Sequence, residues 1–362
     1  MNIKKIIKVM IMLSFVNIPN TTVWGQSSGL SIYSVTNTTN WIVSNNKRIN
    51  LLDKNIDGIT NYIRWAQIEP SEGKFDWVGL DRMAKEANDN NKKMSYNILA
   101  GAHAPPWLYK YTKPYPYHFH DRANTTYLPW VETKTGRKLN YVVLNKWKST
   151  VNGLASYIYS KGYQKNISYI AITGGPTGNG LEVMWAQDNY AEMRDLNFDR
   201  EADKLFIDFW KNVIDIYLEA FPDIPLGIAF ADYFGLEKNG KIRRNYSIPK
   251  EIVNYALARA ELKNTKIIPM ALWIGTINPL SYNNSEAIKL LDSFGTDVAL
   301  QGEIKTKSRQ QLEQILNLAI RKKAAWIELW DNDILNGDYD ETIKNNRKKN
   351  HDSLKRKNKR AN

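Results

Sequence analysis

The 362-residue sequence predicts an α/β protein built as a single (β/α)8 TIM barrel, on two observations. First, short apolar or β-branched runs recur along the chain, and each is followed by a loop and a stretch of helical periodicity. Second, there are eight such runs, the number that closes a parallel sheet into a barrel. An open doubly wound sheet is the alternative. The predicted strands are Leu30–Val35, Ile59–Trp65, Met94–Ala100, Ile167–Thr173, Pro225–Ala231, Ile267–Trp273, Asp297–Gly302 and Ala324–Leu329.

Helices are predicted between these runs. Val151, Leu154 and Ile158 fall at positions i, i+3 and i+7, which places them on one face of a helix. Similar apolar stripes occur between Phe206 and Tyr217 and between Leu312 and Ile320. Each stripe lies between two predicted strands, as a barrel requires.

The third and fourth predicted strands are separated by a long segment, Gly101–Lys165. Its first part, Ala104–Tyr127, is rich in proline, tyrosine, histidine and tryptophan. A long loop that follows a barrel strand is typically functional. We expect this long aromatic loop after strand three to form one wall of a cleft.

The composition excludes several classes of site. The chain has no cysteine, so disulfides, thiolate metal sites and a cysteine nucleophile are excluded. With only four histidines a three-histidine zinc centre is not expected, and neither a metal nor another cofactor is predicted. The glycine-rich run between Gly174 and Gly180 lacks the Gly-Lys-Ser/Thr of a phosphate-binding loop, and no G-x-S-x-G motif is present.

The net charge of +13 is concentrated at the two ends of the chain. Residues 1–25 combine three lysines with a short apolar stretch, which predicts a signal peptide and a secreted or periplasmic protein. Residues 344–362 carry nine Lys and Arg against one Asp and are predicted to be a disordered basic tail. The barrel, 26–343, is then nearly neutral. We therefore expect no nucleic-acid partner and no membrane span, although the tail could dock to an anionic polymer. The oligomeric state stays open.

Two motifs follow the second and third predicted strands. The run E-P-S-E-G-K-F-D-W occupies Glu69–Trp77, and P-P-W-L occupies Pro105–Leu108. In this order they resemble the barrel of retaining glycoside hydrolases of clan A, closest to the family 42 β-galactosidase group. The resemblance implies that Glu303, after strand seven, is the nucleophile.

The fourth strand departs from that pattern. The clan ends this strand with Asn-Glu, the glutamate being the acid/base, but here the place reads Thr173-Gly174-Gly175-Pro176. The Gly-Pro-x-Gly run followed by a glutamate is similar to the acid loop of β-amylase-like barrels. The likeness implies that Glu182 is the acid, although three extra residues separate it from Gly178.

The two carboxyls also make chemical sense together. Glycoside cleavage needs one carboxyl that protonates the leaving oxygen and a second that attacks the sugar or activates water. Strands four and seven lie across the mouth of a barrel, where reactive groups gather, so Glu182 and Glu303 could face each other. The sequence therefore predicts a hydrolase that cleaves a poly- or oligosaccharide with retention. A non-catalytic sugar-binding barrel is the alternative, because the Asn-Glu pair is missing.

Other side chains at strand ends are candidates for binding the sugar. Tryptophan rings can stack on the C–H face of a sugar, a histidine can donate to a hydroxyl, and an arginine can hold Glu303 ionised. The alternatives are packing at the top of the barrel for the tryptophans, a hydrogen-bonded loop residue for the histidine and a core-lining charge for the arginine. The candidates are Arg64, Trp65, His103, Trp107, Trp185, Trp273 and Trp330.

Two further glutamates are given structural interpretations. Glu69 precedes a proline and is expected to fix a loop by hydrogen bonding. Glu328 lies between two apolar residues of the eighth predicted strand. We expect it to point inward and form an ion pair under the site.

Overall fold

A computed structural model of the chain describes eleven stretches. They are residues 30–37, 55–112, 115–118, 125–128, 141–175, 178–183, 200–231, 246–274, 286–302, 306–334 and 339–348. Statements about the structure below concern these residues.

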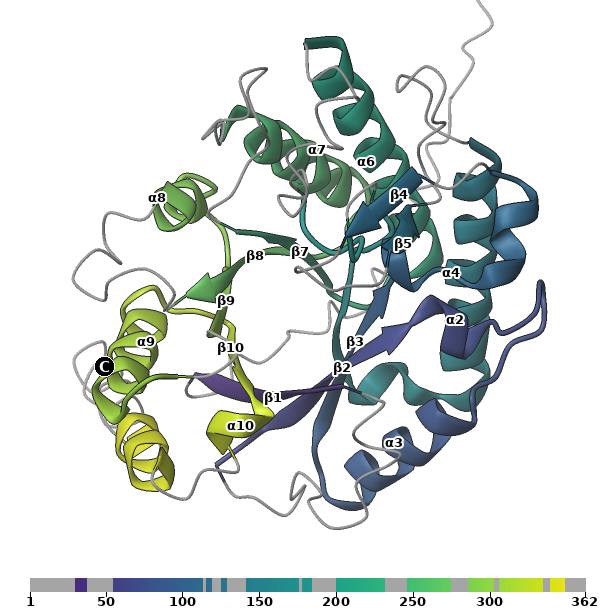
Figure 1. Cartoon of the computed structure of the whole chain (residues 1–362). Helices are drawn as coiled ribbons and strands as arrows, with labels where there is room; N and C mark the ends of the chain where they lie inside the picture. The colour runs from purple at the N-terminus through teal and green to yellow at the C-terminus, as the bar shows by residue number, and fades with distance from the viewer. Residues whose placement is uncertain are drawn as a thin grey trace, which may run out of the picture.

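Eight parallel strands form a closed barrel in the order β1-β10-β9-β8-β7-β6-β3-β2 (Figure 1). Closure comes from β1, which pairs with both β10 and β2. The open-sheet alternative is therefore excluded, and each strand coincides with one of the eight predicted runs to within two residues at each end. The barrel strands are β1 Ser31–Asn37, β2 Gly58–Arg64, β3 Lys93–Leu99, β6 Ile167–Ala171, β7 Leu226–Phe230, β8 Ile267–Ile274, β9 Ala299–Gly302 and β10 Trp326–Trp330.

Helices surround the barrel and pack their apolar stripes onto it (Figure 1). The predicted faces are buried: Val151, Leu154 and Ile158 lie in the core, as do the stripes between 206 and 217 and between 312 and 319. Ser308 caps one of these helices by accepting a hydrogen bond from the Gln311 amide, 3.2 Å away. The helices are α2 Trp65–Ile68, α3 Val78–Asp89, α4 Tyr141–Lys161, α6 Arg200–Ala220, α7 Ser247–Lys263, α8 Glu286–Asp292, α9 Arg309–Arg321 and α10 Asp331–Ile334.

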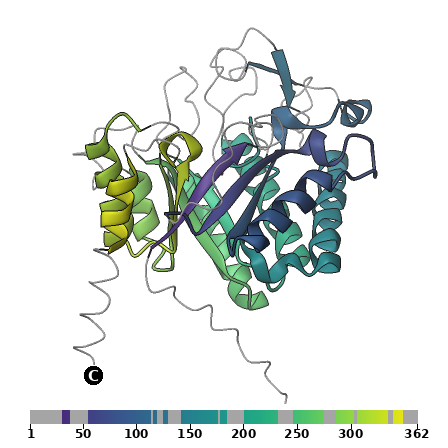
Figure 2. The ribbon, with the colours of Figure 1, turned by 90° about the horizontal axis from the view of Figure 1, so that it is seen from below.

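The described part of the long segment after β3 combines short elements with the 21-residue helix α4. It contains the 3-10 helices η1 (Gly101–His103) and η2 (Pro106–Lys110) and an antiparallel hairpin of β4 (Tyr115–His118) and β5 (Thr125–Leu128), while η3 (Tyr163–Asn166) precedes β6. The strand β5 packs against η1. Figure 2 shows the hairpin, in blue, beyond the end of the barrel toward which the strands run. The predicted wall Ala104–Tyr127 is described in part, and its described backbone lies at the catalytic end of a barrel of this kind.

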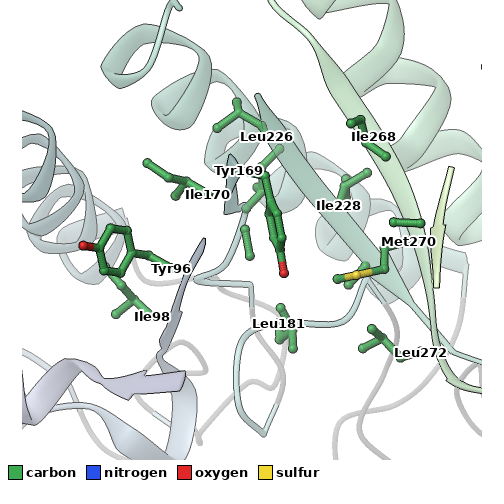
Figure 3. Packing of buried hydrophobic residues seen from close by; sticks show 14 of the residues in the cluster. Tyr96, Ile98, Tyr169, Ile170, Leu181, Leu226, Ile228, Ile268, Met270 and Leu272 are labelled. Atoms are coloured by element: carbon green, nitrogen blue, oxygen red, sulfur yellow. The ribbon is translucent and has the colours of Figure 1, made fainter. Parts of the chain in front are cut away.

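The buried core is continuous from the barrel interior to the surrounding helices. It combines aliphatic side chains with large aromatic ones such as Tyr96 and Tyr169. Figure 3 shows part of this packing, in which Leu181 joins side chains from β3, β6, β7 and β8. A segment that follows β6 therefore contributes to the core.

The predicted border between barrel and basic tail, at 343/344, is wrong. Residues 340–348 form one helix, so the first five residues of the proposed tail 344–362 are ordered. Asn346 is buried, and Arg347 Nη2 lies 2.6 Å from Asp57 Oδ1. The like charges predict disorder here, but Arg347 is paired with Asp57, an acidic residue just before β2. The predicted signal peptide 1–25 lies outside the described residues.

Among the described helices, none combines the length and the apolar character that crossing a bilayer needs.

Candidate active site

The fourth strand is interrupted and then resumes. β6 ends at Ala171, and the Ile172 amide still donates to the Gly227 carbonyl, 2.7 Å away. The register of β6 and β7 pairs Ala171 with Gly227. If the strand continued without a break, residue 173 would lie opposite Ala229. Glu182 occupies that place instead of residue 173. The Val183 amide completes the pairing by donating to the Ala229 carbonyl at 2.9 Å.

This register directs Glu182 toward the barrel interior. Paired residues of neighbouring strands point to the same face, and residues two apart along a strand share a face. Tyr169 lies in the interior, since its hydroxyl reaches Glu328 across the barrel. Ala171, and the position that Glu182 takes over, therefore face inward too. The predicted place of the acid, after strand four, is thus taken by a glutamate. The chain leaves the barrel wall after Ile172 and returns to it at Glu182, and we call this segment the excursion.

The glycines of the excursion allow close packing against two tryptophans. Gly174 has φ +106°, and a Cβ there would overlap the Trp147 indole. A Cβ on Gly175 would overlap the Trp210 ring. The Trp147 Nε1 donates to the Thr173 carbonyl at 2.9 Å, which holds the start of the excursion. The glycine-rich run is therefore explained by packing.

Backbone hydrogen bonds close the excursion and fix its return. The Gly174 amide donates to the Gly180 carbonyl at 2.7 Å, and the Ala100 amide donates to the Asn179 carbonyl at 2.9 Å. The Asn179 Nδ2 donates to Glu182 Oε1 at 3.1 Å, while its Oδ1 accepts from the Leu181 amide at 2.9 Å. Asn179 thus orients the carboxyl of Glu182, a residue that is 5% exposed. Sequence reasoning missed Asn179, although an Asn three residues before a candidate acid is a signal that could have found it.

A buried polar cluster lies beneath the mouth. Glu328 is fully buried and accepts hydrogen bonds from Thr60 Oγ1 at 2.8 Å, Gln301 Nε2 at 2.6 Å and the Tyr169 hydroxyl. Gln301 Nε2 also donates to the Tyr62 hydroxyl at 2.7 Å. The predicted inward direction of Glu328 is confirmed. The predicted ion pair is wrong within the described part of the chain, because the three hydrogen-bond partners are neutral.

Burial governs the acid–base behaviour of this cluster. It raises the pKa of Glu328 above the ordinary value, while the hydrogen bonds from Tyr169, Gln301 and Thr60 oppose that rise. Burial also raises the pKa of Tyr62 well above 10, and the negative charges of Glu328 and Glu182 add to the effect. Tyr62 therefore keeps its proton at neutral pH.

The prediction that Trp65 binds substrate is wrong. Its side chain is 0% exposed and packs edge-on against Trp147, with ring centroids 4.8 Å apart. Strand alternation explains the error, since the preceding residue of β2, Arg64, shares the inward face with Tyr62, and Trp65 therefore turns toward α4.

Glu69 fixes the loop after β2, as predicted. Its Oε2 accepts from Trp65 Nε1 at 2.8 Å and from Thr150 Oγ1 at 2.6 Å, and its Oε1 accepts from the Gly73 amide at 2.9 Å. The first residue of the motif Glu69–Trp77 therefore serves to hold this loop in place. Trp107 belongs to the same assembly, because its Nε1 donates to the Glu69 carbonyl at 2.9 Å.

The remaining candidates lie at the catalytic end to different degrees. His103 ends η1 and is half-buried, and Arg64 ends β2, also half-buried, with no carboxylate of the described residues in ion-pair contact with its guanidinium. Trp330 ends β10 and stacks on Tyr62, with centroids 5.7 Å apart and planes inclined by 27°. Glu303 and Trp185 lie outside the described residues.

Trp273 sits in a β-bulge near the end of β8. The β8–β9 register pairs Ala271 with Leu300 but Ile274 with Gly302, so two residues of β8 oppose Gln301. Trp273 has φ +58°, a conformation that is strained for a bulky residue. The other described non-glycine residues with positive φ, Asn91, Asn264 and Lys323, follow helix ends, where this conformation is common. Because of the bulge, Trp273 takes the position opposite Gln301, whose side chain faces the barrel interior.

Within the described residues, no group of three or more His, Asp or Glu side chains is placed to hold a metal ion.

Comparisons with known proteins agree with this architecture. A family model described as beta-galactosidase, from glycoside hydrolase family 42, matches residues 44–137. The match includes both motifs, Glu69–Trp77 and Pro105–Leu108. The predicted resemblance to that group is confirmed over this stretch. It spans less than half of the chain.

Solved structures of glycosidases share the fold. The catalytic domain of a beta-amylase from Paenibacillus polymyxa matches with a TM-score of 0.57 and 9% identity, covering 86% of this chain and 95% of that one. Xylanase 10B from Thermotoga maritima matches with a TM-score of 0.53 and 10% identity, covering 84% and 83%. Xylanase 10B from Thermotoga petrophila RKU-1, in complex with xylobiose, gives 0.51 and 10%, covering 84% and 82%. At these identities the likeness establishes the (β/α)8 fold.

Proposed function

We propose that this protein is a glycoside hydrolase that cleaves a poly- or oligosaccharide, with Glu182 as the general acid/base. The observation that carries the proposal is the return of the chain to the barrel wall at Glu182. Its inward carboxyl is oriented by Asn179 at the end of the barrel where reactive groups gather. A buried, oriented carboxyl at this place suits protonation of a leaving oxygen. The family match to beta-galactosidase supports the same reaction class.

The second carboxyl in this proposal is Glu303, which follows Gly302 at the end of β9. In the sequence it stands two residues after Gln301, which faces inward. We assign it the nucleophile of a retaining mechanism, in which it forms a glycosyl-enzyme intermediate that water hydrolyses with Glu182 now acting as the base. In this scheme Arg64, on the inward face of β2, holds Glu303 ionised.

The sugar-binding assignments extend the proposal. Trp273 and Trp330, at the ends of β8 and β10, supply stacking surfaces. His103 donates to a sugar hydroxyl, and Trp185 contributes a further ring. Trp107 lines the wall with the part of its ring that stays exposed. The hairpin β4–β5 lies beyond the same end of the barrel (Figure 2), and we assign it to one wall of the substrate site.

The test is hydrolysis of a substrate panel by the purified protein. The panel contains starch, xylan and the 4-nitrophenyl β-glycosides of galactose, glucose and xylose, and the Glu182→Gln and Glu303→Gln variants are assayed beside the wild type. We expect each variant to lose about 10²–10⁴-fold in kcat. Full activity in either variant removes that residue from the scheme. Binding without turnover by the wild type favours a non-catalytic sugar-binding barrel.

Two finer assignments have tests of their own. Retention of the anomeric configuration is read from the first product by proton NMR, and an inverted product assigns Glu303 to activation of water.

Secretion is read from the mature N-terminus after expression with residues 1–25. Cleavage before Gln26 is the expected result, and an uncleaved cytoplasmic protein contradicts it.

A further inference from the structure

The side chain of Asn179 serves two partners in opposite ways. Its Oδ1 accepts from the Leu181 amide at 2.9 Å, and its Nδ2 donates to Glu182 Oε1 at 3.1 Å. The first of these bonds, from an asparagine to the amide two residues on, is an Asx turn. A backbone amide can only donate, so the oxygen of Asn179 must face Leu181 and its NH2 must face Glu182. The loop backbone therefore fixes the direction of the bond to Glu182.

The backbone around Asn179 is itself held from the end of β3. The Ala100 amide donates to the Asn179 carbonyl at 2.9 Å, and the Ala102 amide donates to the Gly178 carbonyl at 2.8 Å. The next residue, Gly180, has φ +74°, and a Cβ there would lie 2.9 Å from the Ala100 Cβ. The loop thus packs directly on the chain that follows β3, and the NH2 of Asn179 is preorganised as a donor.

The donor makes the two oxygens of the Glu182 carboxyl unequal. A protonated carboxyl has a carbonyl oxygen, which accepts well, and a hydroxyl oxygen, which donates. Because Oε1 accepts from Asn179, Oε1 takes the part of the carbonyl oxygen and the proton resides on Oε2. Glu182 is buried, so bulk water competes little for the bond. The carboxyl therefore presents its proton from one defined oxygen.

Resting on the glycosidase function proposed above, we infer that Asn179 is a positioning residue that assigns the catalytic proton of Glu182 to Oε2. In the acid step the Oε2–H bond breaks and the proton joins the leaving oxygen, which keeps the electron pair of the broken glycosidic bond. Glu182 is left as a carboxylate, and the bond from Asn179 stabilises the charge that forms. Asn179 thereby also sets the pH range in which Glu182 acts.

Few other groups titrate near Glu182. The strand on which it pairs, β7, carries no titratable side chain. On β2, β6, β10 and η1, the titratable or charged groups of the barrel interior and its mouth are Tyr62, Arg64, Tyr169, Glu328 and His103. Burial raises the pKa of both tyrosines well above 10, so they stay protonated, and the arginine stays charged. Glu328 and His103 are the described groups whose titration must be separated from that of Glu182.

Two variants keep the turn and change only the group that faces Glu182. In Asn179→Ser the hydroxyl can accept from the Leu181 amide but is too short to reach Glu182. We expect kcat on the best panel substrate to fall about tenfold. The pKa of Glu182 should rise by about one unit, because the lost donor favoured the carboxylate. The basic limb of the pH–kcat profile therefore moves to higher pH.

Asn179→Asp should act in the same direction and more strongly. Its carboxyl also accepts from the Leu181 amide, but it places a second acid beside Glu182. Two adjacent carboxyls hold one proton between them up to a higher pH, so the basic limb should move further upward. The shared proton is directed at Oε1 instead of residing on Oε2, and kcat should fall about 100-fold. Loss of loop structure alone would lower kcat without moving the limb.

Asn88→Asp is the matched control for the added charge. Asn88 lies on α3 near the start of β3, at the opposite end of the barrel, and its Oδ1 accepts from Asn166 Nδ2 at 2.7 Å. An aspartate keeps that acceptor, so kcat and the basic limb should both stay as in the wild type. The inference is overturned if Asn179→Ser keeps the wild-type kcat and limb, or if Asn88→Asp moves the limb equally. If Asn179→Asp does not fold, Asn179→Ser alone decides.

A titration without substrate distinguishes failure of this inference from failure of the proposed function. Carbon-13 NMR of protein labelled at the glutamate carboxyls follows each one with pH, and the signal missing from Glu182→Gln belongs to Glu182. A raised pKa in Asn179→Ser, together with its lower kcat, supports the inference. An unchanged pKa in a protein that hydrolyses sugars rejects the inference and leaves the function standing. A raised pKa in a protein that hydrolyses no panel substrate rejects the function, and with it the catalytic use of the proton.

Discussion

Glu182 lies opposite Ala229 in the barrel wall, although β6 itself ends at Ala171. The chain leaves the wall, packs its glycines against Trp147 and returns in register. The candidate acid therefore depends on a loop outside the barrel for its place inside it. Stability and activity should be linked at this loop.

Gly174→Ala tests that link. The new methyl overlaps the Trp147 indole, and the residue must also adopt φ +106°. We expect the free energy of unfolding to fall by about 2–4 kcal/mol and kcat to fall with it. Urea unfolding and kcat on the best panel substrate measure both. Gly295→Ala is the matched control, because its φ of +63° is positive but its Cβ would meet nothing within 4 Å. Equal losses in the two variants would contradict the clash with Trp147.

Glu69→Gln tests the loop after β2. One oxygen of Glu69 accepts two donors and the other accepts one, so an amide must turn its NH2 toward a donor. We expect the free energy of unfolding to drop by about 1–3 kcal/mol, measured by urea unfolding. Glu72→Gln in the same motif is the control. Glu72 pairs with Lys110 and Lys146 at the surface, and its loss should shift Tm far less. A larger shift for Glu72→Gln would argue against the structural role of Glu69.

The eight strands could be predicted because buried parallel strands appear in a sequence as apolar runs, and all eight runs coincide with strands. The direction in which a side chain points just beyond the end of a strand could not be predicted. Trp65 is one of five predicted strand-end tryptophans, but it follows the inward-facing Arg64 and therefore turns into the core. Only three-dimensional register reveals that difference.

The sequence could predict that a glutamate serves the candidate site after strand four. It could not predict the contacts that hold this glutamate in place. The glutamate after strand four was recognised by its place in the order of motifs. Its return to the wall depends on the bond between Gly174 and Gly180 and on Asn179, contacts that no spacing rule encodes. The neutral partners of Glu328 were missed for a similar reason, since Thr60 and Gln301 come from distant strands.

Truncation of the C-terminus tests where the folded part ends. Removal of residues 349–362 should leave Tm unchanged. Removal of 344–362 also deletes the Arg347–Asp57 pair and the buried Asn346, and it should lower the free energy of unfolding by about 1 kcal/mol or more. Thermal unfolding of the two truncated proteins measures the difference. Identical Tm values would move the border back to residue 343.

The pH dependence of stability should reveal Glu328. Its pKa is raised by burial, so its protonated form is favoured in the folded state. The stabilisation is present below pH 4.5 and is lost as pH rises through the raised pKa. The Tm of wild type minus that of Glu328→Gln should therefore be largest near pH 4 and decrease toward neutral pH. A difference that grows with pH would indicate that the hydrogen bonds outweigh burial.

Trp273 offers a test of strain retained for function. Glycine adopts φ +58° without steric penalty, so Trp273→Gly removes about 1–2 kcal/mol of backbone strain while losing the packing of a half-buried ring. Trp273→Ala loses the ring but keeps most of the strain. We expect the glycine variant to be the more stable of the two in urea unfolding. We also expect KM to rise about tenfold in both, because the ring that we propose to stack on the sugar is gone. An alanine variant as stable as the glycine variant would show that the bulge carries no strain. An unchanged KM would instead assign Trp273 to packing at the barrel top.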